Sequence, residues 1–425
     1  MKTRAFAIYP ILVAIAILTG IVFADTTPSQ PPASKSKTKK KKKRSTARST
    51  ATKPVASAVK SAPKPLVGKV VTQSTSKHFV GKVSGPTVRR RRRVYSEWDE
   101  PTYADSTVGD NVDGEDLDVR RAAVEALGPL NGTVVVSDPN TGRILAMVNQ
   151  KLALSDGFQP CSTVKVPVAF AALSEGLVDR TTMVRIYGRT KLNLTQALAK
   201  SNNQYFAKLG EQLGYEKFSY YAHLFGLGEK AGLDIPGEHA GHFPAEPPKN
   251  GGMGMLTSFG EEISLTPLQL AAIMGSIANG GTLYYLQHPR SQEEIANFVP
   301  RIKRRLEIEN QIAEVEPGMR GAVQYGTARR IQALTEDNIM GKTGTCSDRR
   351  THLGWFGSFS EINGKKVAVA VLLTGGKPCV GPAAAGVAGG VYKRLSEQHF
   401  FEAKSAMTTA AFVSQSNSLH PASGY

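Results

Sequence analysis

Ser162-Thr-Val-Lys165 begins a run of apolar residues with helical spacing that extends to Leu177. A separation of three residues places Ser162 and Lys165 one above the other on one helix face. A serine there can act as a nucleophile when a base removes its proton, and a neutral lysine can be that base. The helix N-terminus adds a positive dipole end beside the developing oxyanion. The pattern alone carries no weight, because residues 34–77 contain five further Ser-x-x-Lys matches.

Two further polar motifs lie downstream, Ser201-Asn-Asn203 and then Lys342-Thr-Gly-Thr345, and the second is the more specific. Lys342-Thr-Gly-Thr345 occurs once, on a predicted strand, and Gly344 leaves room for another backbone or a substrate to lie against that strand. The hydroxyl and ammonium groups of this motif can hold a carboxylate. Ser201-Asn-Asn203 interrupts a helical run from Thr195 to Leu213. Taken separately, Lys342 could simply be a charged residue that prevents an edge strand from pairing with another chain, and Ser201 could simply cap a helix. All three motifs in this order indicate a serine acyl-transfer site.

The hydrophobic pattern around these motifs predicts strands near both ends of the folded region and helices between them. A hairpin is expected from residues 133–136 and 143–148, joined by the turn Asp138-Pro-Asn-Thr-Gly142. Other strands are expected at 341–345, 354–360 and 367–373, and helices at 120–127, 162–177, 195–213, 383–395 and from 266 to the stop at Asn279-Gly-Gly281. Strands from distant segments that share one sheet predict an α/β or α+β fold.

The combination S-T-V-K, S-N-N and K-T-G-T resembles the signature of penicillin-binding proteins and class A β-lactamases. The flanking sequence is similar to the transpeptidase domain of penicillin-binding proteins, and the similarity covers about residues 130–397. The segments that carry it are 138–147, 194–201, 225–228, 232–238, 265–270, 278–281 and 326–328. The resemblance implies a mainly antiparallel central sheet flanked by helices, with a helical subdomain and the active site between them. We expect this transpeptidase domain to span residues 120–397.

The resemblance implies a catalytic role for three residues. Ser162 would attack the carbonyl between the last two D-alanines of a peptidoglycan stem peptide, and Lys165 would accept its proton. For Lys165 to be neutral near pH 7, its pKa must fall, and both desolvation and the nearby positive charge of Lys342 act in that direction. Ser201 would relay a proton toward the leaving group.

The resemblance also implies which residues bind substrate. Asn203 would hold the substrate amide, and the terminal carboxylate would lie against Lys342, Thr343, Gly344 and Thr345. The backbone N–H groups of Ser162 and Thr345 would form the oxyanion hole. An amine of a second stem peptide would then resolve the acyl-enzyme and give a crosslink, and β-lactams would inhibit by acylating Ser162. No cofactor or metal is expected, and a separate glycosyltransferase would supply the glycan strands.

The chain departs from the family at its three cysteines. Cys161 precedes the nucleophile where the family usually has a small residue, Cys346 follows the third motif directly, and Cys379 lies after the last strand. Each can be a small buried hydrophobe, but an exported protein can also form a disulfide. The resemblance places the loop after the last strand near the rim of the cleft. We therefore expect a Cys346–Cys379 pair.

Several alternatives share these motifs. A D,D-carboxypeptidase uses water as acceptor and has the same acyl-enzyme. A serine β-lactamase or a β-lactam sensor is also compatible, because residues 160–167 resemble the nucleophile segment of class D β-lactamases. Those proteins usually carry Ser-x-Val where this chain has Asn203. A different class of protein would be a polyanion- or envelope-binding protein with an inactive transpeptidase-like domain.

The net charge of +18 belongs to the N-terminal part of the chain. Residues 1–93 contain 22 Lys and Arg and a single acid, whereas residues 94–425 contain 31 Lys and Arg and 34 acids. The folded part is therefore near neutral, and nucleic-acid binding by a basic globular domain is not indicated. Residues 25–93 predict a disordered basic tether, and its stretch 35–93 can bind anionic lipid or polymer.

The N-terminal end of the chain predicts export, and the C-terminal end predicts a flexible tail. Residues 1–24 fit either a cleaved signal peptide or a retained membrane anchor, and both alternatives place the domain outside the cytoplasm, on the periplasmic side of the inner membrane. Residues 94–119 carry nine acids and no Lys or Arg, which predicts a solvated acidic junction. Residues 398–425 predict a flexible C-terminal tail.

Overall fold

The computed structural model describes residues 100–400, except residues 336, 349 and 363. The predicted signal or anchor, the basic tether and all but three residues of the predicted C-terminal tail lie outside the described residues. Within residues 100–400, no helix is both long and apolar enough to cross a membrane.

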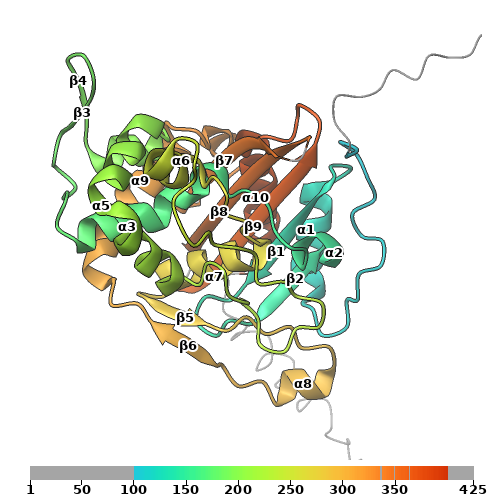
Figure 1. Cartoon of the computed structure of the whole chain (residues 1–425). Coiled ribbons are helices and arrows are strands. Elements are labelled where there is room, and N and C mark those ends of the chain that lie inside the picture. Colours follow the sequence, from blue (N-terminus) through green and yellow to red (C-terminus); the bar gives the residue numbers. More distant parts are fainter. Residues whose placement is uncertain (1–99, 336, 349, 363, 401–425) are drawn as a thin grey trace, which may run out of the picture. The chain divides into compact units, whose positions relative to one another are not determined.

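A five-stranded antiparallel sheet forms the centre of the domain (Figure 1). Its strand order is β2-β1-β9-β8-β7, so the N-terminal hairpin pairs with the three C-terminal strands. The strands are β1 (Gly132–Ser137), β2 (Ile144–Val148), β7 (Ile339–Asp348), β8 (Thr351–Ile362) and β9 (Lys365–Gly375). The expected sheet from distant segments is confirmed, and β7, which carries Lys342-Thr-Gly-Thr345, is an edge strand.

Helices cover both faces of this sheet because alternate strand residues are apolar on each side. Val134 and Val371 pack with α1 (Leu117–Leu127) and α10 (Gly381–Glu397) on one face. Val135 and Leu372 pack on the other face, in a cluster with α7 (Pro267–Ala278). The capping box of Thr266 and Gln269 fixes the start of α7.

A helical subdomain lies beside the β7 edge of the sheet (Figure 1). It contains α3 (Lys165–Ser174), α4 (Leu194–Ala199), α5 (Asn203–Leu224), α6 (Gly252–Phe259) and α9 (Glu309–Gln324). The predicted break at Ser201-Asn-Asn203 is the junction of α4 and α5. The remaining elements are α2 (Gln150–Ala153), η1 (Cys161–Val164), β3 (Val184–Tyr187), β4 (Thr190–Leu192), β5 (Thr282–Tyr284), α8 (Gln292–Ala296), β6 (Ile302–Arg305) and η2 (Arg329–Ala333).

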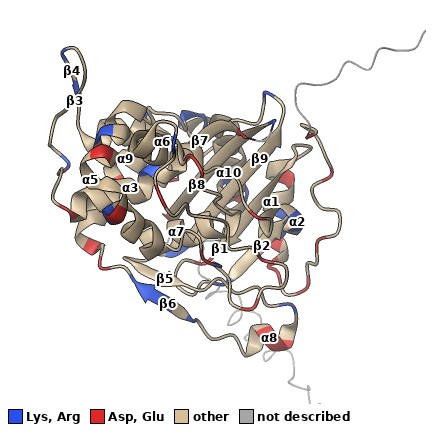
Figure 2. Ribbon diagram, in the orientation of Figure 1, with Lys and Arg blue, Asp and Glu red and all other residues tan. Residues whose placement is uncertain are grey.

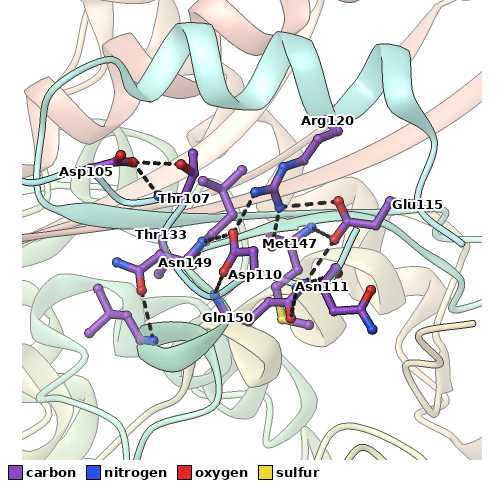
Figure 3. Close-up of polar contacts among 12 residues, drawn as sticks. Asp105, Thr107, Asp110, Asn111, Glu115, Arg120, Thr133, Met147, Asn149 and Gln150 are labelled. Carbon is purple, nitrogen blue, oxygen red and sulfur yellow. Dashed lines mark hydrogen bonds and ion pairs between the residues drawn. The ribbon is translucent and has the colours of Figure 1, made fainter. Parts of the chain in front are cut away.

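Asp110 and Glu115 of the acidic segment are part of the fold, which corrects the prediction of a solvated junction for the described residues. The Asp110 carboxylate accepts hydrogen bonds from the backbone N–H groups of Asn149 and Gln150 and pairs with Arg120 at 2.7 Å (Figure 3). The Glu115 carboxylate accepts from the backbone of Met147 and pairs with the same guanidinium at 3.3 Å. Both acid side chains are at most 2% exposed. Opposite charge and backbone donors therefore hold residues 110–115 against β2 and the start of α2.

Positions of both charge signs are interspersed along the ribbon in Figure 2, apart from strand β6 and the β3–β4 hairpin, whose charged residues are all Lys or Arg. This distribution agrees with the near balance of charge in residues 94–425.

Candidate active site

The nucleophile candidate lies in a tight turn that leads into a helix. Ser162 belongs to η1, which continues into α3, and its side chain is half-buried. The Thr163 hydroxyl donates to the carbonyl of Pro160 at 2.7 Å, and the Trp355 indole donates to the carbonyl of Gln159 at 2.9 Å. The strand β8 thus holds the turn through Trp355, and Ser162 has a fixed position beside the sheet.

Lys165 lies directly against this serine. Its Nζ is 2.8 Å from Ser162 Oγ, 3.1 Å from the carbonyl oxygen of Ser201, and also contacts Asn203 Oδ1. The Lys165 side chain is fully buried, and desolvation lowers its pKa to about 7. A substantial fraction of Lys165 is therefore neutral at physiological pH and can accept a proton from Ser162.

Ser201 connects two buried lysines. Its hydroxyl is 3.3 Å from Lys165 Nζ and 2.8 Å from Lys342 Nζ. Burial, and secondarily the charge on Lys165, hold the pKa of Lys342 well below its usual range. Ser201 has a left-handed backbone with φ 54°, a conformation that is uncommon for a serine and is found at functional sites. The α4–α5 junction therefore presents this hydroxyl between the two amines.

The third motif lies on the edge strand β7, next to the nucleophile turn. A Cβ atom added to Gly344 would lie 2.8 Å from the Pro160 carbonyl oxygen and 2.9 Å from Trp355 Cβ. Of the two expected occupants beside Gly344, a backbone or a substrate, the structure shows a backbone, and only glycine permits this approach. The exposed Thr345 accepts a hydrogen bond on Oγ1 from the backbone N–H of Gly381.

Thr327 is a site neighbour to which sequence analysis gave no role. Its Oγ1 is 2.5 Å from Thr343 Oγ1, and either hydroxyl can be the donor. The sequence carried a signal, because residues 326–328 belong to the segments that resemble the family. The structure thus brings Ser162, Lys165, Ser201, Asn203, Lys342, Thr343, Gly344 and Thr345 to one place, between η1, the α4–α5 junction and β7.

Comparison with known proteins places this arrangement in a family. The model of the penicillin binding protein transpeptidase domain matches residues 132–397. The chain belongs to this family. Members of the penicillin-binding protein transpeptidase family are typically serine acyl-transferases that act on peptidoglycan and bind β-lactams.

The individual family members that this chain resembles are only 25–30% identical to it over the matched residues. The chain is 28% identical over 326 residues to the peptidoglycan D,D-transpeptidase PbpA of Mycolicibacterium smegmatis, covering 61% of this chain and 66% of that protein. It is 30% identical over 226 residues to the stage V sporulation protein D of Bacillus subtilis, covering 47% and 34%. The crystal structure of Pseudomonas aeruginosa PBP2 in complex with WCK 5153 matches with a TM-score of 0.59 at 25% identity, covering 69% and 77%. The chain spans about a third to two thirds of the length of these curated relatives.

The disulfide of this family member differs from the expected one. Cys346 is bonded to Cys161, with the two Cα atoms 5.6 Å apart, whereas Cys379 is a buried free thiol. The predicted Cys346–Cys379 pair is wrong because successive side chains of a strand point to opposite faces. Thr345 points toward Gly381 in the segment after Cys379, so Cys346 points away from that segment and toward the nucleophile turn.

Proposed function

We propose that this protein is a peptidoglycan D,D-transpeptidase that forms a serine acyl-enzyme on Ser162. The observation that carries the proposal is the contact between Ser162 Oγ and the desolvated Lys165 Nζ at 2.8 Å. A base with a pKa near the working pH, within hydrogen-bond distance of a hydroxyl, is the arrangement that general base catalysis requires.

In the acylation step, neutral Lys165 takes the Ser162 proton as Oγ attacks the carbonyl between the last two D-alanines of a stem peptide. The backbone N–H groups of Ser162 and Thr345 stabilise the oxyanion. The Ser201 hydroxyl, which lies between Lys165 and Lys342, passes a proton to the departing amine. An amine of a second stem peptide then attacks the acyl-enzyme, with Lys165 again as base.

Substrate binding uses the exposed Thr345, the half-buried Thr327 and the buried Thr343 and Lys342 at the β7 edge. The exposed Thr345 hydroxyl and the Thr343–Thr327 pair provide donors for the terminal carboxylate, and buried Lys342 adds positive charge when protonated. The side-chain carbonyl oxygen of Asn203 accepts a hydrogen bond from Lys165 Nζ. The amide N–H groups of Asn203 are then left to bind the substrate backbone.

The acylation rate is expected to rise with pH through about pH 7 and then to level off. Lys165 is the base only in its neutral form, and its pKa is lowered to about 7, so protonation below that pH removes the base. The measurement is the second-order rate constant for acylation by a penicillin between pH 5.5 and 8.5. A flat profile over this range would contradict a titrating Lys165 as the base.

A transpeptidase transfers the acyl group to an amine, whereas a D,D-carboxypeptidase transfers it to water, so the acceptor distinguishes the two enzymes. A pentapeptide stem ending in D-Ala-D-Ala is incubated with the full-length protein and a fluorescent D-amino acid, and products are separated by chromatography. We expect exchange of the terminal D-alanine for the fluorescent residue, and none with Ser162→Ala. Hydrolysis without exchange would instead identify a D,D-carboxypeptidase, and rapid turnover of penicillin would identify a β-lactamase.

The cellular setting is part of the proposal. Export through residues 1–24 would place the domain at the periplasmic side of the inner membrane, where stem peptides occur. The basic tether, residues 25–93, would hold the domain off the membrane, and its stretch 35–93 would bind anionic lipid or polymer. A separate glycosyltransferase would provide the glycan strands, and β-lactams would act as inhibitors.

A further inference from the structure

The Cys161–Cys346 disulfide joins the two segments that carry the oxyanion hole. Cys161 directly precedes Ser162 in η1, and Cys346 directly follows Thr345 in β7. The bonded residues are 185 positions apart in the sequence, so the bond connects segments that reach the site independently. The two backbone N–H groups proposed to hold the oxyanion, those of Ser162 and Thr345, therefore each lie one residue from a bonded cysteine.

The disulfide lies next to a second close contact between β7 and η1. Alternate residues of β7 face η1: Gly344 approaches the Pro160 carbonyl, and Cys346, two residues further, is bonded to Cys161. Within the described residues β7 pairs with β8 alone and is an edge strand, so the contact at Gly344 adds to the hydrogen bond by which Trp355 of β8 holds the turn. Packing holds the strand near Gly344, and a covalent bond holds it at Cys346.

The backbone at Cys161 also needs support. Its φ is 51°, in the left-handed region, which a residue other than glycine adopts at a cost and keeps only where its surroundings hold it there. This residue sets the direction in which the chain enters Ser162. The side chain of Cys161 is fully buried, and its bond to Cys346 fixes that buried position.

We propose that the Cys161–Cys346 disulfide is a positioning element, which holds the Ser162 and Thr345 backbone N–H groups at the spacing that the oxyanion requires. This inference rests on the proposed acyl-enzyme function, and it adds that the spacing of the two oxyanion-hole N–H groups depends on the disulfide. Displacement of a reacting group by about 1 Å costs on the order of 10²-fold in rate. Since acylation and release of the acyl group both pass through an oxyanion, loss of the bond slows both steps.

The test measures release from an acyl-enzyme that is already formed. The oxidised full-length protein is acylated with a labelled penicillin, excess penicillin is removed, and a phosphine reductant is added to one half. The phosphine becomes its oxide by taking oxygen from water, and the bridge becomes two thiols. Mass after alkylation in denaturant then shows three thiols in place of one. Release of label per acylated molecule is followed, together with the melting temperature.

We expect reduction to lower both the release rate constant and the acylation rate constant by about tenfold to a hundredfold, while the melting temperature stays above the assay temperature. The double variant Cys161→Ala/Cys346→Ala should show the same slow rates and no response to the phosphine. The matched control Cys379→Ala, which removes the free buried thiol, should behave like the unmodified protein.

The outcomes are distinguishable. A purely structural bridge would reduce the fraction of protein that can be acylated, but the rate of release from each surviving acyl-enzyme would not change. That result, or three thiols in the unreduced protein, would overturn the inference alone. A folded, oxidised protein that is never acylated would overturn the proposed function and the inference together.

Discussion

Replacing Lys165 with methionine is expected to lower the second-order rate constant for acylation of Ser162 by about 10³-fold. Methionine retains the length and the burial of the side chain but has no group that accepts a proton. The Lys165 amine is the group that combines contact with Ser162 Oγ and a pKa lowered to about 7. Its loss leaves a hydroxyl nucleophile without a base, while the oxyanion hole remains.

The measurement is a time course of labelling by a fluorescent penicillin at several concentrations. Lys151→Met is the matched control, because Lys151 is exposed on the short helix α2 and should leave the rate unchanged. Melting curves establish that both variants are folded. A decrease of less than tenfold with folded Lys165→Met would mean that another group activates Ser162.

Replacing Arg120 with methionine is expected to lower the free energy of unfolding by about 3 kcal/mol. The Arg120 guanidinium pairs with both Asp110 and Glu115, whose side chains are at most 2% exposed (Figure 3). Without the guanidinium, two carboxylates remain buried with no cation between them. The backbone donors at Met147 and Asn149 remain, so the expected loss is at the lower end of the range for broken buried pairs.

Urea unfolding followed by circular dichroism measures this loss. The neighbouring Arg121→Met is the control, because the Arg121 side chain is 59% exposed and pairs only with the exposed Asp118 in the described contacts. Its effect should be within about 0.5 kcal/mol. Equal stability of the two variants would show that the segment before α1 contributes little to folding.

The sequence was most informative where a pattern is local. The polar break at Ser201-Asn-Asn203, the helix start at Thr266 and the strand around Gly344 each depend on neighbouring residues, and the structure has all three as predicted. The order of the three motifs then indicated one site, although their contacts cross more than 140 residues, as between Ser201 and Lys342.

The sequence was least informative where partners are distant and chemically ambiguous. Nine acids in a segment that itself contains no Lys or Arg indicate solvation, because no local pattern shows that Arg120 and the backbone of β2 bind Asp110 and Glu115. The disulfide was assigned from the position of a loop, whereas the face of β7 on which Cys346 lies decides its partner. Thr327 could not be assigned a role because one hydroxyl has many uses until its neighbour Thr343 is known.

The covalent site of penicillin attachment tests the central claim most directly. The full-length protein is incubated with penicillin and digested, and the peptides are sequenced by tandem mass spectrometry. The account predicts one modified peptide, heavier by an intact penicillin, with the added mass on Ser162 and no adduct in folded Ser162→Ala. An adduct on another residue, or no adduct on folded protein, would contradict a serine acyl-enzyme activated by Lys165.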